Sequence, residues 1–587
     1  MSFPSIHSPG PVTAPPRVAV SALIGMLICL AGFCRVAAED DPQEDAYLQA
    51  KPEDLQWFRE ARFGLFVCWG PVSLVGTEIG WSRGGIRRGM PSDHPEWGDL
   101  SNTSLTGCPV EQYDNLYRQF DAADFDADQW VDLIKQAGMK YVIFLTKHHD
   151  GFCMFDSALT DYDIMSTPLG RDVTKELADA CHRAGIRICW YYSQPDWHHS
   201  DYYTENHERY IEYLHGQIRE LLTNYGKIDV IWFDGLFCTE DKVQSRRLLK
   251  MIRTLQPGIL VNNRIGGLPG DFVTPEQTIG RYQEDPPWES CITLGTQWSW
   301  KPNDEIKSLR ESLQTLIRCA GGDGNLAYDV GPMPNGRIEE RQAVILRGMG
   351  DWLRQYGQTI YGTRGGPILP GRWGASTRTD KFIYLHVLEW SQDELRLPPL
   401  EKSIVSSSLL NGGEVVVHQD QDGITIGVAP EFRNEIDTIV MLEMDGPVTD
   451  LKPKSMPSGS LAVRKAVQAS SVWGAGYEPE LAVDDDDTTR WGAAPGSRSG
   501  WLEVDLGTDR TFQRAVINQE GWNRINQFEL QSWNGNTWET FYASPANERV
   551  AGKVQLEFQP VTARRVRLNI PASTDVITIW EFQLFPQ

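Results

Sequence analysis

Cysteine is scarce in this sequence, with 10 residues in 587. Two of them, Cys29 and Cys34, belong to an N-terminal segment that we expect to be removed, which leaves eight between Cys68 and Cys319. Eight cysteines are too few for a disulfide scaffold in a chain of this length, and no two have the C-x-x-C spacing of a zinc site. We therefore expect several buried free thiols.

Basic residues are also under-represented, since 55 Lys and Arg face 79 Asp and Glu and the net charge is -24. Nucleic acids and anionic membrane surfaces need clustered Lys and Arg, so we expect neither as a partner. This net charge would have little effect on the binding of a neutral substrate. Tryptophan, in contrast, is abundant at 21 residues, and its flat apolar ring can stack on the C–H face of a sugar.

A long apolar run occurs at the N-terminus, where Arg17 precedes residues 18–33 and Val36-Ala37-Ala38 follows them. A basic residue, an apolar stretch and small residues in this order predict a signal peptide over 1–38. The predicted location is secreted or periplasmic, without membrane insertion after cleavage. A retained anchor is the alternative, although the run is short for a spanning helix.

Between about residues 50 and 355, short apolar strands alternate with helical patterns, which indicates an α/β fold with parallel strands. More than four such units favour an irregular (β/α) TIM-like barrel over an open sheet, and reactive groups lie at the carboxyl ends of barrel strands. Two helices are predicted at 126–137 and 173–184, the latter capped by Asp172 and ended by Gly185. The expected strands are 63–69, 140–147, 186–192, 229–233, 259–262 and 326–330.

After the barrel the helical period disappears. Short strands at 382–387, 414–418 and 438–443 predict a β-sandwich. Pro453 and Pro457, with neighbouring Ser and Gly, indicate a linker, and a second all-β unit follows. The predicted domains are the signal peptide at 1–38, the barrel at 39–360, the β-sandwich at 361–452, the linker at 453–462 and the C-terminal unit at 463–587.

Polar groups follow four of the predicted strands, at positions that meet on one rim of a barrel. They comprise a carboxylate, imidazoles, hydroxyls, aromatics and one Arg, with no nucleotide-binding glycine pattern. Sugar hydrolysis suits this set, because it needs one ionised and one protonated carboxyl group beside the scissile bond. His148 and His149 are an alternative metal site, but neighbouring side chains on a strand point to opposite faces and no third ligand is evident. We therefore expect no cofactor for catalysis.

Seven motifs, in this order and spacing, resemble glycoside hydrolase family 29, the α-L-fucosidases, over about residues 50 to 450. They are Phe63-Gly64-Leu65-Phe66, Trp69-Gly70, Lys147-His148-His149-Asp150-Gly151-Phe152, Tyr191-Tyr192-Ser193, Trp232-Phe233-Asp234-Gly235, Asn262-Asn263-Arg264 and Val330-Gly331-Pro332-Met333-Pro334-Asn335-Gly336.

The resemblance implies a retaining double displacement with Asp234 as the nucleophile. It places the general acid/base about forty residues later, at Glu276, with Glu289 as the alternative because it too lies beside an aromatic that could raise its pKa. The two carboxyl groups of a retaining enzyme should lie about 5 Å apart. The implied substrate-binding residues are Glu78, Trp81, His148, His149, Tyr191, Arg264 and Trp298.

The sequence departs from the family pattern at two positions of this rim. Cys68 stands where the family usually has His, so a strong hydrogen-bonding group has become a weak one. Asp329 stands where Asn usually precedes Val-Gly-Pro, which adds a carboxyl group near the rim. Cys68 is therefore included among the substrate-binding residues, and the identity of the sugar stays open.

The C-terminal unit resembles a discoidin, or factor 5/8 type C, β-sandwich of the kind also seen as family 32 carbohydrate-binding modules. The resemblance rests on the acidic segment 482–491, on 500–507 and on Trp580-Glu581-Phe582. It implies a structural Ca²⁺, which prefers oxygen ligands. The candidate ligands are Asp484, Asp486, Thr489 and Glu581; a solvated acidic turn is the alternative.

Together these features predict a secreted exo-α-L-fucosidase that removes terminal fucose from oligosaccharides, polysaccharides or glycoprotein glycans. A hydrolase of another L-glycoside, such as an α-L-galactosidase, would keep the mechanism and change the sugar. A carbohydrate-binding protein without catalysis is the third possibility, although binding alone would not require a nucleophile at Asp234.

Overall fold

The computed structural model describes residues 47–90, 99–100, 108–235, 238–390, 392–485, 489–519, 524–545 and 552–586. The predicted signal peptide at 1–38 lies outside these residues. Within them, no helix is both long and apolar enough to cross a bilayer.

The first half of the chain forms a curled parallel sheet of seven strands in the order β7-β6-β5-β4-β1-β9-β8. Every residue of β1, β4, β8 and β9 is buried, as expected for a sheet enclosed on both faces. The strands are β1 (Phe63–Val67), β4 (Tyr141–Lys147), β5 (Arg187–Ser193), β6 (Val230–Asp234), β7 (Leu260–Val261), β8 (Glu289–Thr293) and β9 (Asn325–Val330). The TIM-like fold expected from the sequence is therefore present.

An irregular segment closes the gap between β7 and β8. Parallel bridges join Asn262 to Phe272, Val273 to Trp288 and Glu276 to Cys291, so residues 272–276 take the place of an eighth strand. Neither β8 nor this segment was predicted from the sequence. Because the segment runs in the same direction as the strands, it ends with Glu276 at the same rim as the other strand ends.

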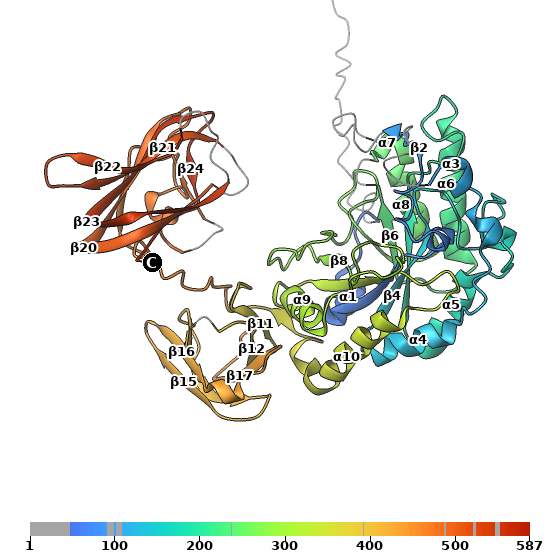
Figure 1. Ribbon diagram of the computed structural model, residues 1–587, viewed down its shortest axis with the longest axis horizontal. Coiled ribbons are helices and arrows are strands. Elements are labelled where there is room, and N and C mark those ends of the chain that lie inside the picture. The colour runs from blue at the N-terminus through green and yellow to red at the C-terminus, as the bar shows by residue number, and fades with distance from the viewer. Residues whose placement is uncertain are drawn as a thin grey trace, which may run out of the picture. The chain divides into compact units, whose positions relative to one another are not determined.

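Helices cover the outside of the barrel (Figure 1), and neighbours contact each other: α5 packs on α4, α4 on α10, α10 on α9, and α6 on α8. The predicted helix 173–184 is confirmed as α5, with the Asp172 carboxylate accepting the Lys175 N–H and Gly185 in the left-handed region at φ 70°. The longer helices are α1 (Pro52–Ala61), α4 (Ala127–Gln136), α5 (Val173–Ala184), α6 (His207–Thr223), α8 (Ser245–Leu255), α9 (Leu309–Gly321) and α10 (Glu340–Tyr356), and the single-turn helices are α3 (Val110–Tyr113) and α7 (Glu240–Val243).

Two antiparallel sheets follow the barrel and share one apolar core. The five-stranded sheet has the order β10-β11-β12-β17-β14 and the three-stranded sheet the order β13-β16-β15. Their strands are β10 (Arg364–Gly365), β11 (Gly374–Arg378), β12 (Phe382–Val387), β13 (Glu394–Leu397), β14 (Ile404–Leu409), β15 (Val415–Asp420), β16 (Gly423–Val428) and β17 (Thr438–Met444).

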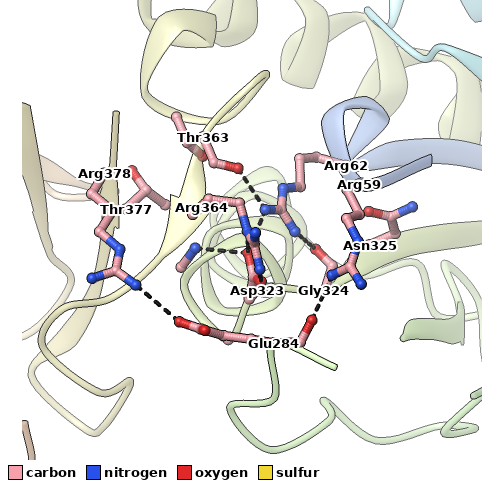
Figure 2. A network of polar contacts seen from close by, with 12 residues as sticks. Arg59, Arg62, Glu284, Asp323, Gly324, Asn325, Thr363, Arg364, Thr377 and Arg378 are labelled. Carbon is pink, nitrogen blue, oxygen red and sulfur yellow. Dashed lines mark hydrogen bonds and ion pairs between the residues drawn. The ribbon is translucent and has the colours of Figure 1, made fainter. Parts of the chain in front are cut away.

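A buried ion network connects the base of the barrel to β10. Figure 2 shows Arg62 and Arg364 converging on Asp323, at 2.6 and 2.5 Å. Arg62, which is 1% exposed, also donates to the carbonyl oxygens of Gly324 and Thr363. Each charge thus has an ionic partner, which a buried ion pair requires to be tolerated, although Arg62 Nε has no hydrogen-bond partner among the described residues.

The C-terminal unit is a separate β-structure with its own core. Its six-stranded sheet pairs β18-β20-β23-β21-β22 in order, with β25 against β20, and a short sheet pairs β19 with β24. The strands are β18 (Ala466–Ala469), β19 (Trp491–Gly492), β20 (Gly500–Asn518), β21 (Ile525–Trp533), β22 (Trp538–Ala543), β23 (Lys553–Ser573), β24 (Thr578–Ile579) and β25 (Glu581–Phe585). These antiparallel sheets agree with the expected discoidin-like sandwich.

Candidate active site

A pocket opens at the carboxyl ends of the barrel strands. One part of its wall is polar and carries both candidate catalytic carboxylates, and the rest is aromatic or carries thiols. The lining residues are Phe66, Cys68, Trp81, His148, Tyr191, Trp232, Asp234, Glu276, Cys291 and Trp298. The structure therefore brings together most of the site residues predicted from the sequence.

Asp234 ends β6, and each of its carboxylate oxygens accepts hydrogen bonds. Oδ1 accepts from Arg264 at 2.8 Å and from the Gly235 N–H at 2.7 Å, and Oδ2 accepts from the Tyr191 hydroxyl at 2.7 Å. Burial alone would raise the pKa of Asp234, but the Arg264 charge and the Tyr191 hydroxyl hold that pKa well below its usual range. Asp234 is therefore a fixed, ionised carboxylate, which is the form a nucleophile needs.

Arg264 links the two candidate catalytic carboxylates. Its Nη1 lies 2.8 Å from Asp234 Oδ1 and its Nη2 lies 2.9 Å from Glu276 Oε2. The guanidinium is itself held by the hydroxyl and carbonyl oxygens of Thr274, in the segment that closes the barrel. Glu276 is accessible from the pocket mouth, with 42% of its side chain exposed, so a leaving group can reach it.

The two neighbouring histidines lie on the same side of the pocket. Their rings are 4.1 Å apart, and His149 Nε2 is 3.6 Å from Asp234 Oδ2. The expectation that they point to opposite faces was wrong, because β4 ends at Lys147 and both residues belong to the following loop. Burial lowers the pKa of His149 to about 4, so its ring is neutral.

His148, His149 and Asp234 together have the spacing of a metal-ligand group, since their ligand atoms lie within 4.8 Å of one another. However, both oxygens of Asp234 already accept short hydrogen bonds, and His149 Nδ1 lies 2.6 Å from the Ser193 hydroxyl. A metal ion would have to displace Arg264, which lies 2.8 Å from the carboxylate. The arrangement suits carboxylate chemistry better than metal binding.

Glu289, the alternative acid/base, lies in β8 and is completely buried. Its carboxylate accepts hydrogen bonds from the Tyr141 hydroxyl and from Trp232 Nε1, the latter at 3.1 Å. Burial raises its pKa to about 7, in spite of these hydrogen bonds. A pKa near 7 would suit a general acid, but Glu289 is not among the residues that line the pocket.

The other predicted binding residues divide into two groups. Trp81, Trp298 and Cys68 line the pocket directly. The Glu78 carboxyl group accepts a hydrogen bond from the backbone N–H of Trp298 at 3.1 Å. Burial raises the pKa of Glu78 to about 7. Its carboxylate thus supports the position of Trp298.

Comparison with known proteins decides the family. A family model described as alpha-L-fucosidase matches residues 35–358, more than half of the chain. The chain belongs to the alpha-L-fucosidase family. It is accordingly a glycoside hydrolase.

The match to relatives in the alpha-L-fucosidase family extends over most of the length of each relative. Alpha-L-fucosidase isoenzyme 1 from Paenibacillus thiaminolyticus is 33% identical, with a TM-score of 0.58 over 67% of this chain and 99% of that structure. Thermotoga maritima alpha-fucosidase is 26% identical, with a TM-score of 0.55 over 66% of this chain and 96% of that structure. Human plasma alpha-L-fucosidase is 26% identical over 63% of this chain and 85% of its own.

A second family model, the F5/8 type C domain, matches residues 466–582 of this fucosidase-family chain. Among the predicted calcium ligands, Thr489 donates its hydroxyl to Asp484 Oδ2 at 2.8 Å. Glu581 is buried, with 1% exposure, and Asp486 lies outside the described residues. Two of the predicted oxygen ligands are therefore adjacent.

Three pocket residues of this fucosidase-family barrel were not assigned a role from the sequence: Phe66, Trp232 and Cys291. Trp232 lies between the two sides of the site, with the Arg264 guanidinium 4.6 Å from its ring and the Tyr191 ring at 5.5 Å. The signal that could have found Trp232 is strand alternation, because it lies two residues before Asp234 and so faces the same way. The eight cysteines outside the first 46 residues are all buried and free, as expected.

Proposed function

We propose that this protein is an exported, retaining exo-α-L-fucosidase in which Asp234 is the nucleophile and Glu276 the general acid/base. The observation that carries the proposal is the pair of carboxylates on one pocket, bridged by Arg264 at 2.8 and 2.9 Å. Retaining glycosidases need two carboxyl groups about 5 Å apart, and a single guanidinium contacts both here.

In the first step, an oxygen of Asp234 forms a bond to the anomeric carbon while the bond to the leaving oxygen breaks. Glu276 gives its proton to that oxygen, so the aglycone departs as an alcohol. This requires that substrate binding breaks the contact between Glu276 and Arg264. In the second step Glu276 takes a proton from water, the water oxygen bonds to the anomeric carbon, and Asp234 is released.

The aromatic wall supports fucose as the sugar. Trp81 and Trp298 present apolar ring surface to the pocket, which suits the C5 methyl group of fucose. An α-L-galactoside would place a hydroxymethyl group there, and the hydroxyl of that group would lose its hydration without gaining a hydrogen-bond partner. We therefore expect a higher kcat/KM for 4-nitrophenyl α-L-fucoside than for the α-L-galactoside; the opposite order would favour the α-L-galactosidase alternative.

The test of the mechanism is hydrolysis of 4-nitrophenyl α-L-fucoside by the parent and by Asp234→Ala and Glu276→Ala, each with and without azide. We expect Asp234→Ala to abolish turnover, and azide to restore it with β-fucosyl azide as product. Glu276→Ala should be rescued with α-fucosyl azide. Glu289→Gln is the control and should remain active.

Two results would contradict the assignment. Rescue of Glu289→Ala by azide, without rescue of Glu276→Ala, would transfer the acid/base role to Glu289. A fucosidase whose first product is the β-anomer would be inverting, which is measured by proton NMR during hydrolysis.

We further propose the exo mode that the family resemblance implies, in which the pocket at the strand ends takes one terminal sugar between the two candidate carboxylates and the aromatic side chains. Incubation with a fucosylated oligosaccharide labelled at its reducing end should release only free fucose. Release of larger labelled fragments would indicate internal cleavage instead.

Export is tested by the mass of the mature protein, which should begin near Glu39.

We also propose that the C-terminal unit binds a structural Ca²⁺ through Asp484, Thr489 and Glu581. The oxygens of Asp484 and Thr489 lie 2.8 Å apart, close enough to serve one cation, and hard oxygens suit calcium. When bound, the ion would stabilise the acidic loop. Calcium should raise the Tm of the parent after treatment with EDTA, and Asp484→Ala should lose that increase; an equal increase in both would contradict the site.

A further inference from the structure

Asp329 is a buried carboxyl group on the inner side of the barrel, directly beneath the rim. It lies in β9 opposite Phe66 of β1, two residues after Ala327, which belongs to the core inside the barrel. Side chains two apart on a strand point the same way, so the Asp329 side chain faces inward as well. Its Oδ1 accepts the backbone N–H of Cys68 at 3.2 Å, and Cys68 lines the pocket.

The second oxygen of this carboxyl group is unused. Asp329 is 1% exposed, and Oδ2 has no hydrogen-bond partner among the residues that the structure describes. Burial raises the pKa of Asp329 well above its usual range. The nearby Glu78 carboxyl adds to this, whereas Lys307 and the contact with Cys68 oppose it. The raised pKa favours the protonated form, in which Oδ2 can donate a hydrogen bond as well as accept one.

Four of the ten residues that line the pocket carry polar groups other than thiols or indoles: Asp234, Glu276, His148 and Tyr191. The other lining residues, which include Cys68, are aromatic or carry thiols. Cys291 of β8 lies opposite Ala327 of β9, two residues before Asp329, and Cys68 donates its backbone N–H to Asp329, so both thiols lie near the carboxyl group. A sugar carries hydroxyl groups around its whole ring, and a hydroxyl buried without a partner weakens binding.

We propose that Asp329, which lies behind the lining residue Cys68, is a further specificity-determining residue of the pocket, and that one hydroxyl of the bound sugar reaches its unpartnered Oδ2 when the small Cys68 side chain turns aside. This inference rests on the proposed fucosidase activity. Cys68 and Asp329 are the two positions of this rim that depart from the family pattern. They are in direct contact, because the backbone N–H of Cys68 donates to the Asp329 side chain.

The test compares Asp329→Asn, which keeps a donor and an acceptor, with Asp329→Leu, which has the same size and keeps neither. The substrates are 4-nitrophenyl α-L-fucoside and its 2-, 3- and 4-deoxy derivatives. With the full fucoside, Asp329→Leu should lower kcat/KM roughly tenfold, as expected for one lost hydrogen bond, while Asp329→Asn stays within about threefold of the parent. With one deoxy derivative, the parent and Asp329→Leu should be equal.

Two further variants separate the pocket contact from a structural role. Tyr328→Phe removes a hydroxyl from the same strand that bonds Ser312 at 2.8 Å outside the barrel, so it should leave the kcat/KM values unchanged. Cys68→Val keeps Asp329 but places a larger side chain in front of it, and should give the same substrate-specific loss as Asp329→Leu. It also provides the test if Asp329→Leu does not fold.

The outcomes are distinguishable. Equal loss on all four substrates in Asp329→Leu and Cys68→Val, or no loss on any, would overturn the role of Asp329 and leave the proposed function standing. A parent that hydrolyses no fucoside would overturn both. Loss that is confined to substrates carrying one particular hydroxyl would support the inference and identify that hydroxyl.

Discussion

Replacement of Glu289 by Gln tests the buried interior of the barrel and the assignment of the acid/base together. The side chain is completely buried and accepts hydrogen bonds from Tyr141 and from Trp232. Gln has the same shape and can accept from Trp232 while donating to the Tyr141 oxygen. The substitution therefore removes the ionisation and changes little else.

The magnitude follows from the pKa of Glu289, which burial raises from 4.5 to about 7 in the folded protein. Below pH 4.5 the group is protonated in both folded and unfolded states and has no effect on stability. Between pH 4.5 and 7 only the unfolded chain releases the proton, so the free energy of unfolding falls as pH rises. A difference of about 2.5 units at 1.36 kcal/mol each is about 3 kcal/mol, all of it lost by pH 7.

The assay is the free energy of unfolding of the parent and of Glu289→Gln, measured with urea at several pH values from 4 to 8. The difference in stability between the two proteins should shift by about 3 kcal/mol in favour of the variant across this range. Tyr192→Phe, which removes a buried hydroxyl whose raised pKa keeps it protonated in this range, is the control and should show no such shift. Parallel curves for parent and Glu289→Gln would refute the reasoning, and a catalytically dead Glu289→Gln would refute the choice of Glu276.

Three further outcomes are expected. Asp323→Asn should lower the free energy of unfolding in urea by about 3–5 kcal/mol, because it leaves Arg62 buried and unpaired. Arg364→Gln, on the exposed side of the same network, should lower it by under about 1 kcal/mol. Equal losses would contradict the burial argument. Tyr191→Phe should lower kcat/KM for the fucoside roughly tenfold, because it removes the hydroxyl that donates to Asp234. Tyr192→Phe is the control and should leave kcat/KM unchanged, because the Tyr192 hydroxyl points away from the pocket. Ellman's reagent should label the eight thiols slowly in the folded protein and quickly in guanidinium; fast labelling without denaturant would contradict their burial.

Local patterns predicted six of the seven barrel strands and missed β8. The bounds of α5 agree because capping by Asp172 and termination by Gly185 are properties of a few adjacent residues. The strand-end motifs also led to one pocket, since parallel strands of a barrel end on the same rim. The segment 272–276 could not be found in this way, because its isolated bridges to β7 and β8 leave no regular alternation in the sequence.

The sequence by itself determined which chemical groups the rim carries: a nucleophile candidate at Asp234, an acid/base candidate at Glu276 with Glu289 as the alternative, and an altered position at Cys68. Only the tertiary structure separated the glutamates, placing Glu276 at the pocket mouth and Glu289 beneath Trp232. It also brought Cys68 and Asp329, 261 residues apart, into contact. The physical reason is that exposure and hydrogen-bond partners depend on strands distant in the chain, whereas residue type and local spacing do not.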